Sequence, residues 1–148
     1  MRSVIATILA LLLTACGGGS GSPTAPTQSM PNVGGNYSGA LTIVFPELAT
    51  SVSCPGTTSV TQSGSSLNIA PIILSGQCAG LSIPLGAATI DATGNLAGGA
   101  ATGTYTDPSC GTYTYTGSGG FFGREMRISM NATSRTCYNM NITILLSR

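Results

Sequence analysis

The hydrophobic and polar positions of residues 35–148 alternate with a period of two in several short segments. The alternation is clearest in the last two segments, near 124–132 and 138–147. One face of these segments carries Met126, Ile128, Met130, Tyr138, Met140, Ile142, Ile144 and Leu146. Glu125, Arg127, Ser129, Asn131, Asn139, Asn141 and Thr143 occupy intervening positions. This pattern is typical of half-buried antiparallel strands, and no segment shows a helical period of useful length.

Eight strands are predicted across this region, separated by turns rich in Gly, Ser and Asn. Their expected ranges are 36–45, 57–62, 67–74, 81–91, 96–105, 112–117, 124–132 and 138–147, with 117–123 as a glycine-rich turn. Sequential strands joined by tight turns favour an all-β, antiparallel up-and-down meander, and about eight strands can close into a barrel. Pro71 and Pro84 each remove a ladder donor, so each is expected at an edge or a bulge. The barrel is then open there, or the domain is a two-sheet sandwich.

The strand pattern resembles that of small lipocalin-like or avidin-like barrels, although no diagnostic motif of either family is present. Such a barrel can hold one small apolar ligand. The candidate lining residues are Leu41, Ile43, Met126, Ile128, Met130, Met140, Ile142 and Ile144. The alternative is that these side chains fill a dry core, as most barrel interiors do. Tyr105, Tyr113 and Tyr115 are interpreted as cross-strand packing residues, because packing is a commoner use of an aromatic row than recognition.

The first sixteen residues have the layout of an export signal. Arg2 precedes an apolar run, residues 4–13, which is too short to span a bilayer, and the run ends in Leu13-Thr14-Ala15-Cys16. This resembles the lipobox of bacterial lipoproteins. The resemblance implies a signal peptide at 1–15, acylation of Cys16 and anchoring in a membrane. Because Gly17 rather than Asp follows the cysteine, it also implies the outer membrane. Residues 16–34 are then the lipidated cysteine with a Gly/Ser/Pro tether, and 35–148 the domain.

The four remaining cysteines are expected to form disulfides, because an exported protein matures in an oxidising compartment. Cys54, Cys78, Cys110 and Cys137 each fall in a different connection between predicted strands, and these connections share one end of a meander. We therefore predict the pairs Cys54–Cys78 and Cys110–Cys137. The tether enters at the other end, so these connections should face away from the membrane. The longest of them, 46–56, is where we expect a binding mouth.

The chain is poor in catalytic chemistry. It contains no His, and only 6% of its residues are charged. The mature part balances Glu47, Asp91, Asp107 and Glu125 against Arg124, Arg127, Arg135 and Arg148. This excludes an electrostatic footprint for nucleic acid. We expect no metal site, no cofactor and no enzyme activity, with a dyad of Asp91 and Asp107 as the weak alternative. Glu125 and Arg127 should form a solvated surface pair.

Two functions follow as hypotheses. The first is a lipid-anchored envelope protein that binds a small apolar ligand inside the barrel. The second is a structural module that contacts envelope proteins or polysaccharide through its loops. A lined cavity would favour the first hypothesis, and an exposed apolar or aromatic patch at the loop end would favour the second.

Overall fold

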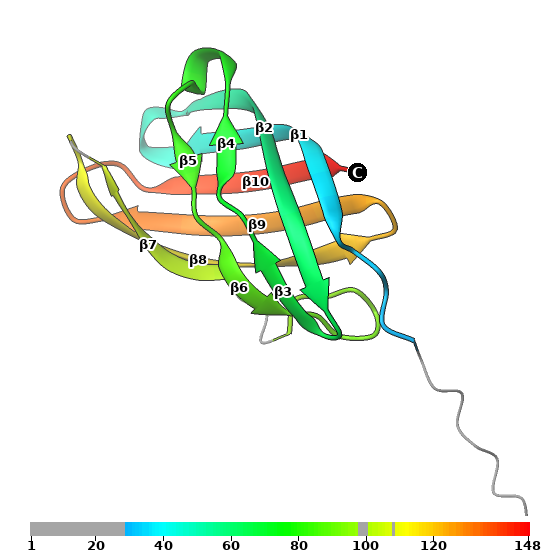
Figure 1. Ribbon diagram of the computed structural model, residues 1–148. Coiled ribbons are helices and arrows are strands. Elements are labelled where there is room, and N and C mark those ends of the chain that lie inside the picture. Colours follow the sequence, from blue (N-terminus) through cyan, green and yellow to red (C-terminus); the bar gives the residue numbers. More distant parts are fainter. Residues whose placement is uncertain (1–28, 98–100, 108) are drawn as a thin grey trace, which may run out of the picture.

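The computed structural model describes residues 29–97, 101–107 and 109–148. The predicted signal peptide, Cys16 and the predicted tether up to residue 28 lie outside the described residues. The described chain is an all-β, antiparallel meander of ten strands that forms a nearly closed barrel (Figure 1). Among the described residues, no helix is long and apolar enough to cross a membrane.

The ten strands occupy eight positions around the barrel. Six positions hold one unbroken strand each: β1 (Gly35–Phe45), β2 (Thr50–Ser63), β7 (Ala101–Asp107), β8 (Gly111–Phe122), β9 (Glu125–Ser134) and β10 (Met140–Ser147). The other two hold an interrupted strand, one divided into β3 (Ser66–Ile69) and β4 (Ile72–Leu74), the other into β5 (Ser82–Ile83) and β6 (Gly86–Thr89). Two 3-10 turns, η1 (Pro46–Leu48) and η2 (Gly76–Cys78), lie in the connections β1–β2 and β4–β5.

The two prolines account for the difference between eight expected and ten observed strands. Thr57 pairs with Ile73 and Val60 pairs with Ile69, so two residues of β2 face three residues around Pro71. That count defines a β-bulge, as predicted for this proline. The buried Thr58 hydroxyl donates to the Ala70 carbonyl at 2.6 Å and satisfies a group that the bulge leaves unpaired. Pro84 separates β5 from β6, but without an extra residue, since two residues face two between the pairs Ile72–Ile83 and Ile69–Gly86.

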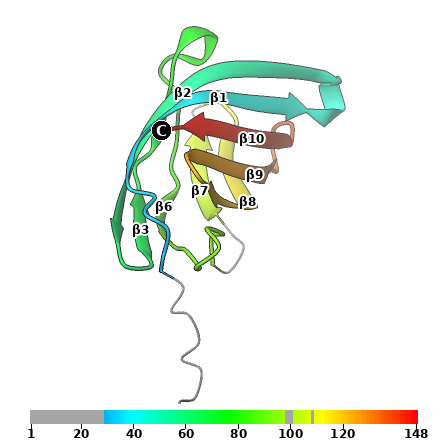
Figure 2. The ribbon, with the colours of Figure 1, turned by 90° about the vertical axis from the view of Figure 1, so that its right-hand side faces the viewer.

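The barrel has one unsealed seam, between β5 and β7, and it is partly bridged. Strand order runs β5-β4-β2-β1-β10-β9-β8-β7, so β5 and β7 are the two ends of the path (Figure 2). Towards the tether, a hairpin of residues 90–97 spans the seam through bridges Ile90↔Leu96 and Asn95↔Gly120. Towards the other end, the Tyr115 hydroxyl donates to the Pro84 carbonyl. Gly103 lies opposite Tyr115, and a side chain there would collide with the tyrosine ring.

Several sequence predictions of the elements need correction. The expected 46–56 loop is only a short turn, because β2 begins at Thr50 and contains Cys54. The glycine-rich turn expected at 117–123 is instead the end of β8. A Cβ at Gly120 would lie 2.5 Å from the Gly94 carbonyl oxygen, so glycine is needed for the 90–97 hairpin to pack there. The expected strand at 96–105 begins later, since residues 96–97 belong to that hairpin.

The end of the barrel at which the chain enters is closed by a buried residue, Val33. Val33 was expected in the flexible tether but is only 1% exposed and belongs to the core. Its amide donates to the Gln62 side chain at 2.7 Å, and its carbonyl accepts from the buried Tyr37 hydroxyl at 2.7 Å. Arg148 holds the neighbouring Gly34 carbonyl at 2.6 Å. The domain therefore begins a few residues before the expected boundary at residue 35.

Candidate functional site

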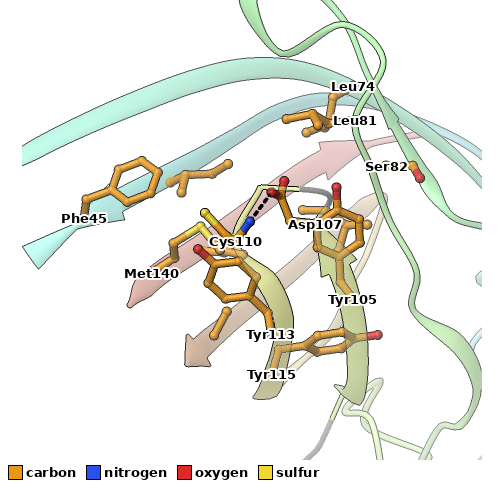
Figure 3. A pocket seen from close by; sticks show the side chains of 14 residues that line it. Phe45, Leu74, Leu81, Ser82, Tyr105, Asp107, Cys110, Tyr113, Tyr115 and Met140 are labelled. Carbon is orange, nitrogen blue, oxygen red and sulfur yellow. Dashed lines mark hydrogen bonds between the residues drawn. The ribbon is translucent and has the colours of Figure 1, made fainter. Parts of the chain in front are cut away.

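The other end of the barrel, which we call the mouth, contains an apolar cavity. Because neighbouring strands alternate in direction, the connections β1–β2, β4–β5, β7–β8 and β9–β10 all lie at this end. The cavity has a volume of about 260 Å³. Its lining, drawn in Figure 3, consists of Ile43, Phe45, Leu74, Leu81, Ser82, Ile83, Tyr105, Asp107, Cys110, Tyr113, Tyr115, Ala132, Met140 and Ile142.

Strand alternation explains why these residues meet. Ile43 and Phe45 are two apart on β1, Met140 and Ile142 two apart on β10, and Ile43 pairs directly with Ile142. Side chains two apart on a strand point to the same face, which here is the interior. Ile43 and Ile142 are buried, whereas Phe45 and Met140 are partly buried at the rim. The interior is therefore filled below and open at the mouth.

Of the eight candidate lining residues, three line this cavity: Ile43, Met140 and Ile142. The other five, Leu41, Met126, Ile128, Met130 and Ile144, lie deeper and are almost completely buried in the core. The barrel interior is thus divided. Among the described residues, its tether half is densely packed and contains a small cavity of about 60 Å³ beside Ile128. The mouth half leaves the larger volume, which a ligand could occupy.

Both predicted cysteine pairs lie at disulfide distance and in the mouth half of the barrel. The Cα atoms of Cys54 and Cys78 are 5.9 Å apart, and those of Cys110 and Cys137 are 5.4 Å apart. The first bond ties β2 to η2, and the second ties the β7–β8 connection to the β9–β10 connection. Cys110 itself lines the cavity. Three of the four cysteines lie in connections at the mouth as predicted, whereas Cys54 lies inside β2 rather than in the connection before it.

The tyrosines combine packing with a place in the cavity wall. Tyr113 and Tyr115 are buried, and Tyr105 is half-buried opposite Tyr113. Burial raises the pKa of Tyr115, and burial raises the pKa of Tyr113, with a further contribution from the negative charges of Asp107 and Glu47. Within the described residues, the hydroxyls of Tyr105 and Tyr113 have no hydrogen-bond partner. Figure 3 shows both rings in the wall of the cavity.

The carboxylates are distributed between the two ends. Asp107 lies in the cavity wall, where one of its oxygens, Oδ1, accepts from the amides of Ser109 and Cys110 at 2.8 and 2.9 Å. Asp91 lies in the 90–97 hairpin, where its carboxylate accepts from Thr93 and Asn95. Thr93, ahead of the other contacts, lowers the pKa of Asp91. The hairpin meets β8 at Gly120, nine residues and roughly 30 Å from Asp107's partner Gly111, so the dyad of Asp91 and Asp107 does not form.

The remaining charged groups are on the surface. Glu125 and Arg127 form the expected exposed ion pair on β9. Glu47 in η1 accepts from the amide and side chain of Asn139 at 3.3 and 2.8 Å, which joins two connections at the mouth. Its own backbone N–H, followed by Asn139, lowers the pKa of Glu47. Among the described residues, no group of three or more His, Cys, Asp or Glu side chains could hold a metal ion.

Several lining residues were not among the sequence candidates, namely Phe45, Leu74, Leu81, Ser82, Ile83, Asp107 and Ala132. Phe45 belongs to the alternating pattern of its strand, so that pattern could have identified it. Leu81 and Ser82 become neighbours of the others only because η2 folds the β4–β5 connection over the mouth. Comparison with known proteins adds no relative: no family model, no curated protein and no solved structure matches this chain.

Proposed function

We propose that this protein is a lipid-anchored component of the bacterial cell envelope that binds a small, mostly apolar ligand in the mouth of its barrel. The observation that supports the proposal most directly is the mouth cavity. Its volume is near the lower end of the range for ligand pockets, about 300–1,000 Å³, which points to a small or partly engulfed ligand. Its lining is apolar and aromatic with few polar groups, the usual composition of such pockets.

The position of the cavity fits the anchoring. The chain enters the barrel at the end opposite the mouth, where Val33 and Arg148 fix it. A protein held in a membrane through Cys16 would therefore present its mouth away from that membrane. Acylation is tested by metabolic labelling with an alkyne fatty acid: the wild type should carry label and partition with membranes, and Cys16→Ala should lose both. Label that persists in Cys16→Ala would contradict the anchor.

Ligand binding is tested by filling the cavity. Ala132 is buried in its wall, so Ala132→Phe should occupy the volume. The matched control is Thr133→Phe, one residue further on β9, whose side chain faces outward. Both variants would be prepared as the mature chain with Cys16→Ser, exported through an ordinary signal, since acyl chains or detergent would compete for an apolar cavity.

The probe is 3-phenylpropan-1-ol, followed by amide chemical shifts. We expect saturable shifts around the mouth in the wild type and in Thr133→Phe, and at least about a tenfold weaker response in Ala132→Phe, since overpacking removes the binding volume. Equal binding by all three proteins, or no binding by any of them, would contradict the proposal. Native mass spectrometry of the exported wild type, before and after denaturation, would reveal a natural ligand as a defined lost mass.

A second candidate function is docking of an envelope partner at the rim of the mouth. It is favoured by the exposure of Leu48, Leu81 and Tyr138, which are 42–50% exposed on three different connections there. Large apolar side chains gathered in this way often mark contact surfaces. Cross-linking from the rim that captures one defined protein, with an empty cavity in native mass spectrometry, would favour this function over ligand binding.

A further inference from the structure

The mouth cavity carries one negative charge and two tyrosine rings on neighbouring positions. Tyr105 and Asp107 are two residues apart on β7 and so share its interior face. Tyr113 pairs directly with Tyr105 across the β7–β8 ladder. Figure 3 shows the two rings and the carboxylate in the same part of the cavity wall. An aromatic pair beside a carboxylate is a chemical environment that attracts cations.

Asp107 has unused capacity for a ligand. Its Oδ1 accepts the two backbone amides that form the turn into β8, whereas its other oxygen has no hydrogen-bond partner among the described residues. An ionised carboxylate can accept about four hydrogen bonds. The turn thus fixes the position of a side chain that lines the cavity and leaves one of its oxygens without a partner among the described residues. Among the described residues, the single ion pair is the one between Glu125 and Arg127, on a different strand.

Among the residues that the structure describes, no cationic side chain lines the cavity to neutralise this charge. Arg135 lies in the β9–β10 connection at the mouth, but it is exposed and lines a hollow on the outer surface with Thr112, Thr114 and Thr133. Arg124 and Arg148 are hydrogen-bonded to each other's backbone at the tether end. Glu47 adds a second negative charge at the mouth, close enough to act on Tyr113. The mouth is therefore acidic as well as apolar.

We infer that the ligand of the mouth cavity is a small organic cation, an apolar body with a protonated amine or quaternary ammonium head, whose head lies against Asp107 between the rings of Tyr105 and Tyr113. This inference rests on the proposed ligand-binding function and names its ligand class. The apolar residues below, including Ile43, Ala132 and Ile142, receive the body of the ligand. The ring faces and the carboxylate receive its charge.

The test compares three ligands with one skeleton: 3-phenylpropylamine, 3-phenylpropan-1-ol and 3-phenylpropanoate, which are cationic, neutral and anionic at pH 7. With the wild type, the amine should bind at least about tenfold more tightly than the alcohol, and the carboxylate most weakly. The amine's advantage should shrink as salt is raised. Equal affinities for amine and alcohol would overturn the inference while leaving the proposed apolar pocket intact.

Variants assign the selectivity to named residues. Asp107→Asn keeps an oxygen that can accept the turn amides but removes the charge, so it should bring the amine to the affinity of the alcohol without changing alcohol binding. Tyr105→Leu should weaken the amine several-fold, and Tyr105→Phe, which retains the ring face, should not. An unchanged amine preference in Asp107→Asn would overturn the inference. If Ala132→Phe alone lost binding of both the amine and the alcohol, this would confirm the pocket independently of charge.

Discussion

The two ends of this barrel are built from the same alternating strands but are finished in opposite ways. At the tether end, Val33, the 90–97 hairpin and Phe121 close the interior, and the core below is almost completely buried. At the mouth, the rim residues Phe45 and Met140 are only partly buried, and a cavity remains. Two disulfides cross-link this half of the barrel. The difference predicts that packing at the closed end contributes more to stability than packing at the mouth, where the proposed ligand site lies.

The largest expected effect is on the free energy of unfolding, and it compares the loss of one phenylalanine ring at each end. Phe121 is buried at the closed end, where its ring meets the ring of Tyr37 edge to face at a centroid distance of 5.7 Å. Phe121→Ala should lower the free energy of unfolding by about 3–5 kcal/mol because it leaves a cavity in a packed core. Phe45→Ala at the mouth should lower it by only about 1–2 kcal/mol, since that ring is partly exposed already.

Urea unfolding followed by circular dichroism measures both variants. Probe binding to the folded fraction should show the reverse order, with Phe45→Ala weakened and Phe121→Ala unaffected. Equal losses of stability at the two ends would show that the mouth is packed as tightly as the tether end, contrary to this comparison.

The next effect concerns the disulfides. The two bonds close loops of similar length, with sequence separations of 24 and 27 residues, so loop entropy predicts a similar loss of about 3 kcal/mol for each. Replacing both cysteines of a pair by Ser tests this in urea. Only the second pair borders the cavity. Cys110→Ser with Cys137→Ser should therefore also weaken probe binding, whereas the Cys54–Cys78 double variant should not.

The sequence predicts a strand correctly where one face of the strand is buried and the other is exposed. The strands at 36–45, 124–132 and 138–147 were correctly predicted because their interior positions, such as Leu41 and Ile128, are apolar and their outward ones polar. The disulfide pairs followed from the meander alone. The start of β2 was missed because Ser51 to Gly56 contains only short side chains together with Pro55 and Gly56, although it pairs along its length with β1.

Other features depend on contacts distant in the chain. Val33 is a single apolar residue in a polar segment, so no periodicity could show that it plugs the barrel. The aromatic and acidic group at the mouth arises from the β7–β8 register, which places Tyr105 opposite Tyr113 and Asp107 at the turn. The sequence located the tyrosines, but it could not show that a carboxylate faces the same cavity.

A smaller effect is expected at the seam. The Tyr115 hydroxyl joins β8 to the Pro84 carbonyl, across the gap where the sheet has no ladder. Tyr115→Phe should lower the free energy of unfolding by about 1 kcal/mol, the usual net value of one hydrogen bond. Tyr113→Phe removes a hydroxyl that has no partner among the described residues and should change stability little. Equal effects of the two substitutions in urea would show that the Tyr115 bond does not hold the seam.

The smallest effect concerns pH, and both ends contribute to it, each with buried tyrosine on the alkaline side and a carboxylate on the acid side. Burial raises the pKa of Tyr37 at the closed end and of Tyr113 and Tyr115 towards the mouth. Their contribution to stability is complete below the unfolded value of about 10 and is lost as pH rises through the folded values, because the unfolded chain then releases protons more readily. Glu47 and Asp91 have lowered pKa values, so their contribution is present above about 4 and is lost on acidification through the folded values.

Since the chain has no His, stability between these limits should be flat from about pH 6 to 9. Urea midpoints measured across this range, and at pH 3 and 11, test the profile. Glu47→Gln, at the mouth, and Asp91→Asn, at the closed end, should each reduce the fall of the urea midpoint on acidification. A midpoint that moves steadily between pH 6 and 9 would contradict this account, because no side chain placed in the barrel should titrate there.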